Sequence, residues 1–156
     1  RSFWKFWIEL NLLNYKNFDL GVGEWILIDQ TTINKFANFS GDQQWIHVDV
    51  QRASKEMPNG QTIAHGLLTL CLSPTLGKNQ LEIENLKLSI NYGIDKVRFT
   101  APVRVNSKVR MNSTISDIIE KDSGVILLKI KRLIEIEGQT KPAMAAETIS
   151  LLHPKD

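Results

Sequence analysis

Two residues that could share proton-transfer chemistry, Asp42 and His47, lie five positions apart in the stretch NFSGDQQWIHVD. On one continuous α-helix, five residues amount to about 500° of rotation, which would put the two side chains on different faces. Gly41 precedes the acid, and glycine tolerates the left-handed conformation that ends many helices. We therefore expect a helix to end at Gly41 and the following turn to fold His47 back toward Asp42. A carboxylate and an imidazole that share one water could then act as general acid and base.

Two helices should position this pair. Residues 24–28 should form a brief strand. Apolar residues at helical spacing within 33–37 mark a short helix, for which Asp29, Thr31 and Thr32 are possible N-caps. The stretch TIAHGLLTLCLSPTLG, residues 62–77, is apolar on every side. Because it is too short to span a membrane, we interpret it as a central helix buried in the core, kinked or ended by Pro74.

The second half of the chain changes to a period of two. One side of the stretch 126–136 is apolar and is interrupted only by Arg132, which predicts a long, half-buried strand. Residues 107–120 should pair with it as a hairpin through a turn at 122–124. Further strands are expected in EIENLKLSINY, KVRFTAPVRV and KPAMAAETISLL. Several antiparallel strands after one apolar helix predict an α+β fold, with a curved sheet wrapped around the helix.

Composition excludes several classes of protein. With 156 residues, 42% of them hydrophobic, the chain should form a single domain over residues 1–156. A net charge of +2 without a dense basic run argues against a nucleic-acid partner. The single cysteine, Cys71, excludes an internal disulfide and fits a reducing compartment, so we expect a cytoplasmic protein.

The aromatic N-terminal segment, residues 1–16, is predicted to be an amphipathic helix packed on the domain or on a partner chain. Phe3, Trp7 and Leu10 follow helical spacing, as do Trp4 and Ile8. The segment is too short and too charged to span a bilayer, which takes about 20 apolar residues. Contact with a membrane surface is the alternative that we favour less.

The stretch FANFSGDQQWIHVD, followed by GQTIAHGLLTLCLSPTL, resembles the MaoC-like dehydratases, the (R)-specific enoyl-CoA hydratases of the hot-dog fold. Within that family the chain is most similar to the nodulation protein N-like branch, through SGDQQWIH, TIAHG and NYGIDKVRF. The resemblance covers roughly residues 17–152. It implies hydration of a trans-2-enoyl thioester to the (R)-3-hydroxyacyl thioester, or the reverse dehydration, in fatty acid metabolism. It also implies a homodimer, a coenzyme A or acyl carrier protein thioester as substrate, and neither a metal nor a separate cofactor.

The same resemblance implies roles for individual residues. Asp42 and His47 match the catalytic acid and histidine, and Gly66 matches the glycine whose backbone N–H polarises the thioester carbonyl. The common hydratase form is Asp-x-Asn-Pro-x-His, and here Gln and Trp replace the Asn and Pro. The residues expected to contact substrate, together with Gly66, are Gln44, Trp45, Ile63 and His65.

Several residues keep a second interpretation. His65 could position a loop or line the pocket, or be purely structural, and Trp45 could cover the mouth of the site or pack in the core. Lys96, Arg98 and Arg104 could meet the phosphates of coenzyme A, but we favour a solvated strand face.

Two other functions compete with the hydratase. A hot-dog thioesterase would use a carboxylate against the thioester carbon, and a non-catalytic acyl-thioester binding protein would need no acid–base pair. The presence of both an acid and a histidine argues against each.

Overall fold

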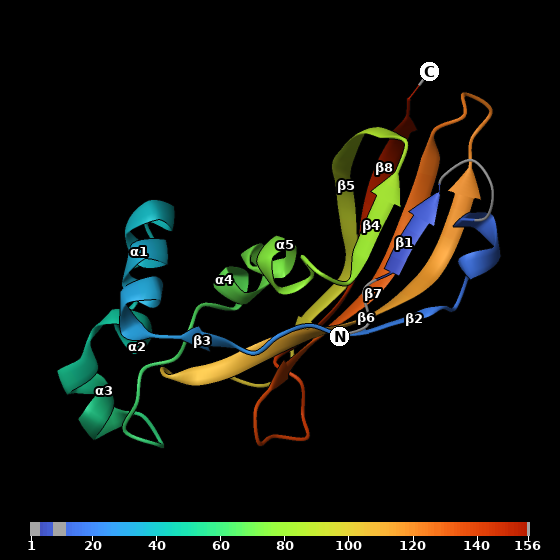
Figure 1. The fold of residues 1–156 in the computed structure, drawn as a ribbon. Helices are drawn as coiled ribbons and strands as arrows, with labels where there is room; N and C mark the ends of the chain where they lie inside the picture. The colour runs from blue at the N-terminus through green and yellow to red at the C-terminus, as the bar shows by residue number, and fades with distance from the viewer. Residues whose placement is uncertain (1–3, 8–11, 156) are drawn as a thin grey trace.

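A six-stranded antiparallel sheet forms most of the structure, a computed structural model that describes residues 4–7 and 12–155 (Figure 1). The strands lie in the order β2-β6-β7-β8-β5, and β3 pairs with β6 beside β2. Their bounds are β2 Asp19–Val22, β3 Ile26–Ile28, β5 Leu86–Phe99, β6 Ser107–Glu120, β7 Ile126–Ile136 and β8 Met144–Pro154. This antiparallel sheet with short helices confirms the predicted α+β class.

The hairpin of β6 and β7 confirms the prediction from alternation. Val109 pairs with Ile136 and Ile115 with Ile130, so the apolar residues of both strands point to the same face. Gly124, with φ of 77°, makes the turn between them. The stretch KVRFTAPVRV was predicted as one strand, and that prediction is wrong for its second half. Its first residues end β5, and Thr100–Asn106 form a loop, because Pro102 has no N–H for a sheet ladder.

The helix before the acid–histidine pair begins and ends as predicted. It is α1, Gln30–Ser40, and the Asp29 carboxylate caps it by accepting from the Thr32 N–H at 2.8 Å. Gly41 ends it in the left-handed conformation, with φ of 80°. Two further helices, α2 Trp45–Val48 and α3 Val50–Glu56, follow at the same end of the molecule (Figure 1). The sequence did not predict α3, whose single buried residue, Ala53, gives no apolar stripe.

The central helix is shorter and less buried than the sequence predicted. It begins only at Gly66, and it consists of α4 Gly66–Cys71 and α5 Ser73–Leu76. Because proline lacks an N–H and crowds the preceding turn, Pro74 near the start of α5 accounts for the break. The helix is also not buried on every side, since Leu67 is 59% exposed and Cys71 is exposed.

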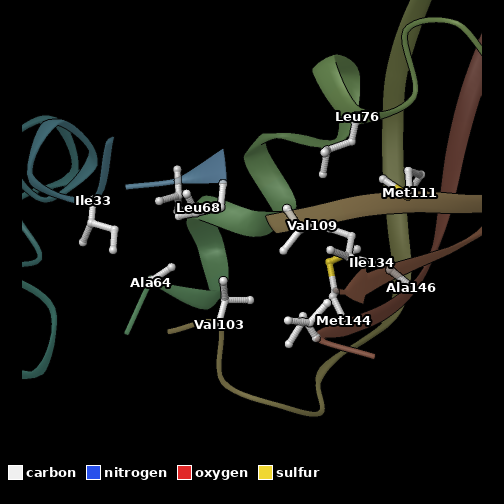
Figure 2. Packing of buried hydrophobic residues seen from close by; sticks show 13 residues of the cluster. Ile33, Ala64, Leu68, Leu76, Val103, Val109, Met111, Ile134, Met144 and Ala146 are labelled. Carbon is white, nitrogen blue, oxygen red and sulfur yellow. The ribbon is translucent and has the colours of Figure 1, made fainter. Parts of the chain in front are cut away.

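The main core lies between α4–α5 and one face of the sheet. Leu68 and Leu76 point from the helices toward side chains of β6, β7 and β8 (Figure 2). The strand residues that meet them are Val109, Met111, Ile134, Met144 and Ala146. A second cluster, built on Leu12, Leu20, Ile115, Ile126, Leu128, Ile130 and Leu152, fills the other end of the same face. The first cluster fixes the helices that carry the site to the sheet, because only it contains residues of α1, α4 and α5.

The amphipathic helix predicted for residues 1–16 is absent from the part of that segment that the structure describes, so the prediction is wrong there. Trp4–Trp7 forms strand β1, which pairs in parallel with β4, Leu81–Glu84. Leu12–Tyr15 is a short 3₁₀ helix, η1. Short apolar and aromatic runs fit both periods, and aromatic residues favour strands when an edge is available to pair with. Residues 1–3 and 8–11 lie outside the described part. Among the described helices, none is both long and apolar enough to cross a membrane.

Candidate active site

Asp42, His47 and His65 come together where α1 ends and where α2 and α4 begin. One carboxylate oxygen of Asp42 and one ring nitrogen of each histidine all lie within 4.8 Å of one another. Gly41 turns the chain out of α1, and the single turn of α2 then brings His47 back beside Asp42. The juxtaposition of the acid and the histidine that the sequence predicted is therefore present.

The environment of His47 fixes which of its nitrogens is free. Its Nδ1 lies 2.7 Å from the backbone oxygen of Ile63. Because a carbonyl only accepts, Nδ1 carries the hydrogen, and Nε2 of the neutral ring keeps a lone pair. Burial of the ring lowers the pKa of His47 below its ordinary value of 6.5, and the neighbouring ring of His65 lowers it further. The Ile63 carbonyl and the Asp42 carboxylate act in the opposite direction but do not outweigh the burial. His47 is thus a neutral base at neutral pH.

His65 holds the loop of Asp42 in place. Its Nε2 donates to the backbone oxygen of Asp42 at 2.9 Å, and its ring stacks on that of His47 with 3.8 Å between the centroids. The ring of Phe36 lies at 4.9 Å from it. His65 is 3% exposed, and its Nδ1 has no partner among the described residues. These contacts support positioning of the acid by His65.

Three predicted substrate-binding residues, His65, Gln44 and Trp45, do not line the cavity of about 300 Å³ beside His47. Gln44 is exposed, and its backbone N–H donates to the carboxylate of Asp42 at 3.3 Å. It orients the acid through its backbone, and its side chain does not line the cavity. Trp45 is half-buried, with the guanidinium of Arg52 at 4.2 Å from its ring. It forms the first turn of α2 and is likewise absent from the cavity wall.

A cavity of about 300 Å³ opens beside His47. Ile63 and Gly66 line it, as predicted, and so do Thr69 of α4 and Phe99 at the end of β5. A Cβ atom on Gly66 would lie 2.7 Å from the ring of Phe99, so only glycine fits there without movement of that ring. This cavity, called the catalytic cavity for its proposed role, therefore meets the backbone at the start of α4 and the side chain of His47.

Comparison with known proteins identifies the family of the chain. Residues 19–135 match the family described as MaoC like domain. This chain belongs to the MaoC-like domain family. It is 44% identical over 130 residues to 3-hydroxyacyl-thioester dehydratase Z of Mycobacterium tuberculosis, covering 83% of this chain and 85% of that protein. It is 40% identical over 141 residues to nodulation protein N of Rhizobium meliloti, covering 88% of each.

Solved structures share the fold of this MaoC-like chain. The unliganded R-hydratase PhaJ1 from Pseudomonas aeruginosa aligns with a TM-score of 0.68 and 20% identity, over 86% of this chain and 82% of that one. At that identity the likeness concerns the fold, and it confirms the hot-dog prediction.

The donor atoms of the MaoC-like site are of kinds that serve acid–base chemistry or hold a metal ion. Asp42, His47 and His65 each offer one ligand atom close enough to share an ion. One nitrogen of each histidine already donates to a backbone carbonyl. Such a bond fixes the tautomer of a histidine whether its other nitrogen takes a proton or binds a metal, so the absence of a metal stays a prediction.

Gln30 is a site residue that the sequence analysis missed. Its Nε2 donates to the backbone oxygen of His47 at 2.7 Å, and its Oε1 accepts from the hydroxyl of Thr62 at 2.5 Å. Gln30 thus ties the first turn of α1 both to α2 and to the loop before α4. No signal in a single sequence distinguishes it from an ordinary glutamine on a helix, because its partners lie 17 and 32 positions away.

Gln30→Ala is expected to lower kcat and to destabilise the fold by about 1–3 kcal/mol, because the buried Thr62 hydroxyl and the His47 carbonyl lose their partner. Kinetics and thermal melts of the variant check this. Asn34→Ala is the matched control, since it removes only the exposed hydrogen bond of Gln30 to Asn34. Equal behaviour of the two variants would contradict the positioning role.

Proposed function

We propose that this MaoC-like protein is an (R)-specific enoyl-thioester hydratase that also catalyses the reverse dehydration of 3-hydroxyacyl thioesters. The observation that carries the proposal is the approach of the Asp42 carboxylate to the neutral imidazole of His47 beside a cavity that also meets Gly66. The relatives named as a dehydratase and an R-hydratase support the same class of reaction.

In the proposed mechanism, Asp42 and His47 hold one water over C3 of the enoyl thioester. The oxygen of the water forms a bond to C3 while Nε2 of His47 accepts its proton, and the pair delivers a proton to C2. The C2–C3 double bond becomes a single bond, so the elements of one water are added and nothing is oxidised or reduced. Dehydration is the same path in reverse.

Negative charge develops on the thioester oxygen as C3 is attacked. The Gly66 N–H lies at the first position of α4, where a backbone N–H has no acceptor within its own helix. A hydrogen bond from this group to the thioester oxygen would stabilise the developing charge more than it stabilises the substrate. Thr69 holds the adjoining Gly66 carbonyl through its hydroxyl, at 2.6 Å.

Crotonyl-CoA tests the proposed function directly. Purified protein should remove the absorbance of its conjugated thioester and yield (R)-3-hydroxybutyryl-CoA. Chiral analysis of the product is decisive. Formation of the (S) product, or release of free coenzyme A instead of hydration, would overturn the proposal.

The pH dependence of the reaction should follow His47. Because its folded-state pKa lies below 6.5, kcat/KM should stay high at neutral pH and fall only as pH drops through that lower value. Stability should change in the same window. Below pH 6.5, His47 of the unfolded chain binds a proton while His47 of the folded chain stays neutral. The free energy of unfolding present above pH 6.5 therefore falls as pH drops through the folded-state pKa. Melts and kinetics of the wild type and His47→Gln check both effects, and an inflection above pH 6.5 would contradict the assignment.

We also propose a homodimer, on the evidence of two uncovered apolar surfaces. Leu67 lies exposed on α4, and β5 carries Ile90, Tyr92 and Ile94, each more than 40% exposed. In the described part of the chain, β5 pairs only with β8, which leaves one edge of a 14-residue strand open. Light scattering should report twice the chain mass of 17.7 kDa, and Ile90→Lys should shift it toward one chain. A monomeric wild type would refute the dimer.

A further inference from the structure

Arg132 is the one charged residue on the core-facing side of β7. Buried Ile130 and Ile134 flank it on that side, and Ser113 and Ala146 lie opposite it on the neighbouring strands. Burial lowers the pKa of Arg132 to about 10, so the guanidinium stays charged at neutral pH. Arg132 is half-buried, and even partial removal of a charge from water is unfavourable without a counter-charge. Its presence in an otherwise apolar row therefore needs an explanation.

Two hydroxyl groups hold this guanidinium from different sides. Its Nη1 donates to Oγ of Ser113 at 2.8 Å, and its Nε donates to Oγ1 of Thr148 at 3.3 Å. The Ser113 hydroxyl gives its own hydrogen to Oε1 of Gln80 at 2.7 Å, and the Thr148 hydroxyl gives its own to the Ile130 carbonyl at 3.4 Å. Both oxygens therefore turn lone pairs toward Arg132.

Gln80 makes this arrangement rigid. It is 1% exposed, and its Nε2 donates to the backbone oxygens of Gly21 at 2.7 Å and Met111 at 3.0 Å. Its amide is therefore fixed with Oε1 toward Ser113. The hydroxyl of Ser113, which binds the guanidinium, is therefore itself held in place by hydrogen bonding.

No counter-charge accompanies Arg132 within residues 4–7 and 12–155. No carboxylate among them lies within 4.0 Å of the guanidinium, and burial alone accounts for its lowered pKa. An arginine has five N–H donors, and the two bonds above use two of them. The remaining three, including both on Nη2, have no acceptor among the described residues. They are free to bind an anion.

A second cavity, of about 640 Å³, has Arg132 in its wall. It lies between α4–α5 and the strands β5, β7 and β8, and most of its wall is apolar. That wall includes Leu70, Pro74, Tyr92, Ile94 and Ile149. The second cavity thus combines a surface suited to a hydrocarbon chain with one fixed cation.

The second cavity follows the catalytic cavity along the same helix face. Gly66 and Thr69 line the catalytic cavity, and Leu70 lines the second one. Residues at i, i+3 and i+4 share one face of a helix, so these three lie in one row. Leu70 stands four residues beyond Gly66, or roughly 6 Å along the axis. An acyl chain longer than crotonyl, with its thioester at Gly66, would extend toward Arg132.

We propose that the second cavity receives the far end of the acyl chain and that Arg132 binds a carboxylate there. The preferred substrates would then be thioesters of medium-length dicarboxylic acids. The inference rests on the proposed hydratase function for the placement of the thioester. A guanidinium with its free N–H groups in a fixed fork binds a carboxylate with two parallel hydrogen bonds.

Binding of two unreactive thioesters tests the inference without turnover. Octanedioyl-CoA and octanoyl-CoA have the same chain length, and only the first ends in a carboxylate. Calorimetry on the wild type should give at least about tenfold tighter binding of octanedioyl-CoA. Equal or tighter binding of octanoyl-CoA by the wild type would overturn the inference with no variant needed.

A pair of variants locates the effect. Arg132→Met should abolish or reverse the preference, because it keeps a similar length without the charge. Lys131→Met, one position along β7 on the outward face, should keep the preference, which excludes a general effect of net charge. Loss of the preference in Lys131→Met, or its survival in Arg132→Met, would contradict the role of Arg132.

The crotonyl-CoA assay separates this inference from the proposed function. Hydration of crotonyl-CoA without any dicarboxylate preference would refute the anion site alone. A dicarboxylate preference without hydration would refute the hydratase and leave the anion site standing.

Discussion

Asp42→Asn and His47→Gln are each expected to lower kcat/KM for enoyl-CoA hydration by about 10²–10⁴-fold, the range for loss of a general acid or base. The first variant keeps the backbone oxygen at position 42 that His65 binds, and the second keeps a polar side chain near the Ile63 carbonyl. Both variants should therefore remain folded. Because the two residues act on one water, the double variant should lose little more than either single variant.

Asp49→Asn is the matched control for the acid. Asp49 lies in the same segment, but its carboxylate caps α3 by accepting from the Arg52 N–H at 2.9 Å, away from the catalytic cavity. The variant should lose some stability and keep its activity. Turnover close to that of the wild type in Asp42→Asn or His47→Gln would remove the pair from the mechanism, and additive losses would assign the two residues to separate steps.

The acid–histidine pair was predictable because its geometry is local. A glycine that ends α1 and the turn after it bring together two residues five positions apart. The sequence indicates both, although not that the turn contains the one-turn helix α2. The hairpin of β6 and β7 was predictable for a similar reason, since alternation sets which face is buried. Gln30 was not, because the carbonyl of His47 and the hydroxyl of Thr62 come to it only in the folded chain.

The errors have a common physical origin. Residues 62–77 are apolar on every side, and we expected one chain to bury all of them. In the structure of the single chain, Leu67 and Cys71 remain exposed. An apolar pattern does not show whether a side chain is covered by its own chain or by a second chain. The aromatic residues of β1 have a spacing that fits a helix. They form a strand instead because they pair with β4. Arg132 was visible as an interruption of the apolar row, yet only the structure shows its hydroxyl partners and the cavity.

Gly66→Ala is expected to lower kcat/KM by about 10²–10³-fold, because its methyl group would keep the thioester oxygen from the N–H, and losing one oxyanion donor usually costs that much. Helix propensity alone predicts that alanine stabilises such a position by up to about 1 kcal/mol. The structure changes that expectation, since the new Cβ would lie 2.7 Å from the ring of Phe99. Phe99 is 45% exposed, so its ring can turn away toward solvent or into the catalytic cavity. We therefore expect a thermal midpoint near that of the wild type together with a large loss of activity.

Phe99→Leu separates the two reasons for a glycine at position 66. In Gly66→Ala combined with Phe99→Leu, the smaller side chain leaves room for the new methyl group, so any loss of stability caused by the ring should be recovered. Activity should stay low, because the methyl group still lies beside the N–H that the thioester must reach. Melts and kinetics of the two single variants and the double variant give the result. If the double variant were as active as Phe99→Leu alone, Gly66 would serve only to leave room for the ring of Phe99. Another backbone N–H of the catalytic cavity would then have to bind the thioester oxygen.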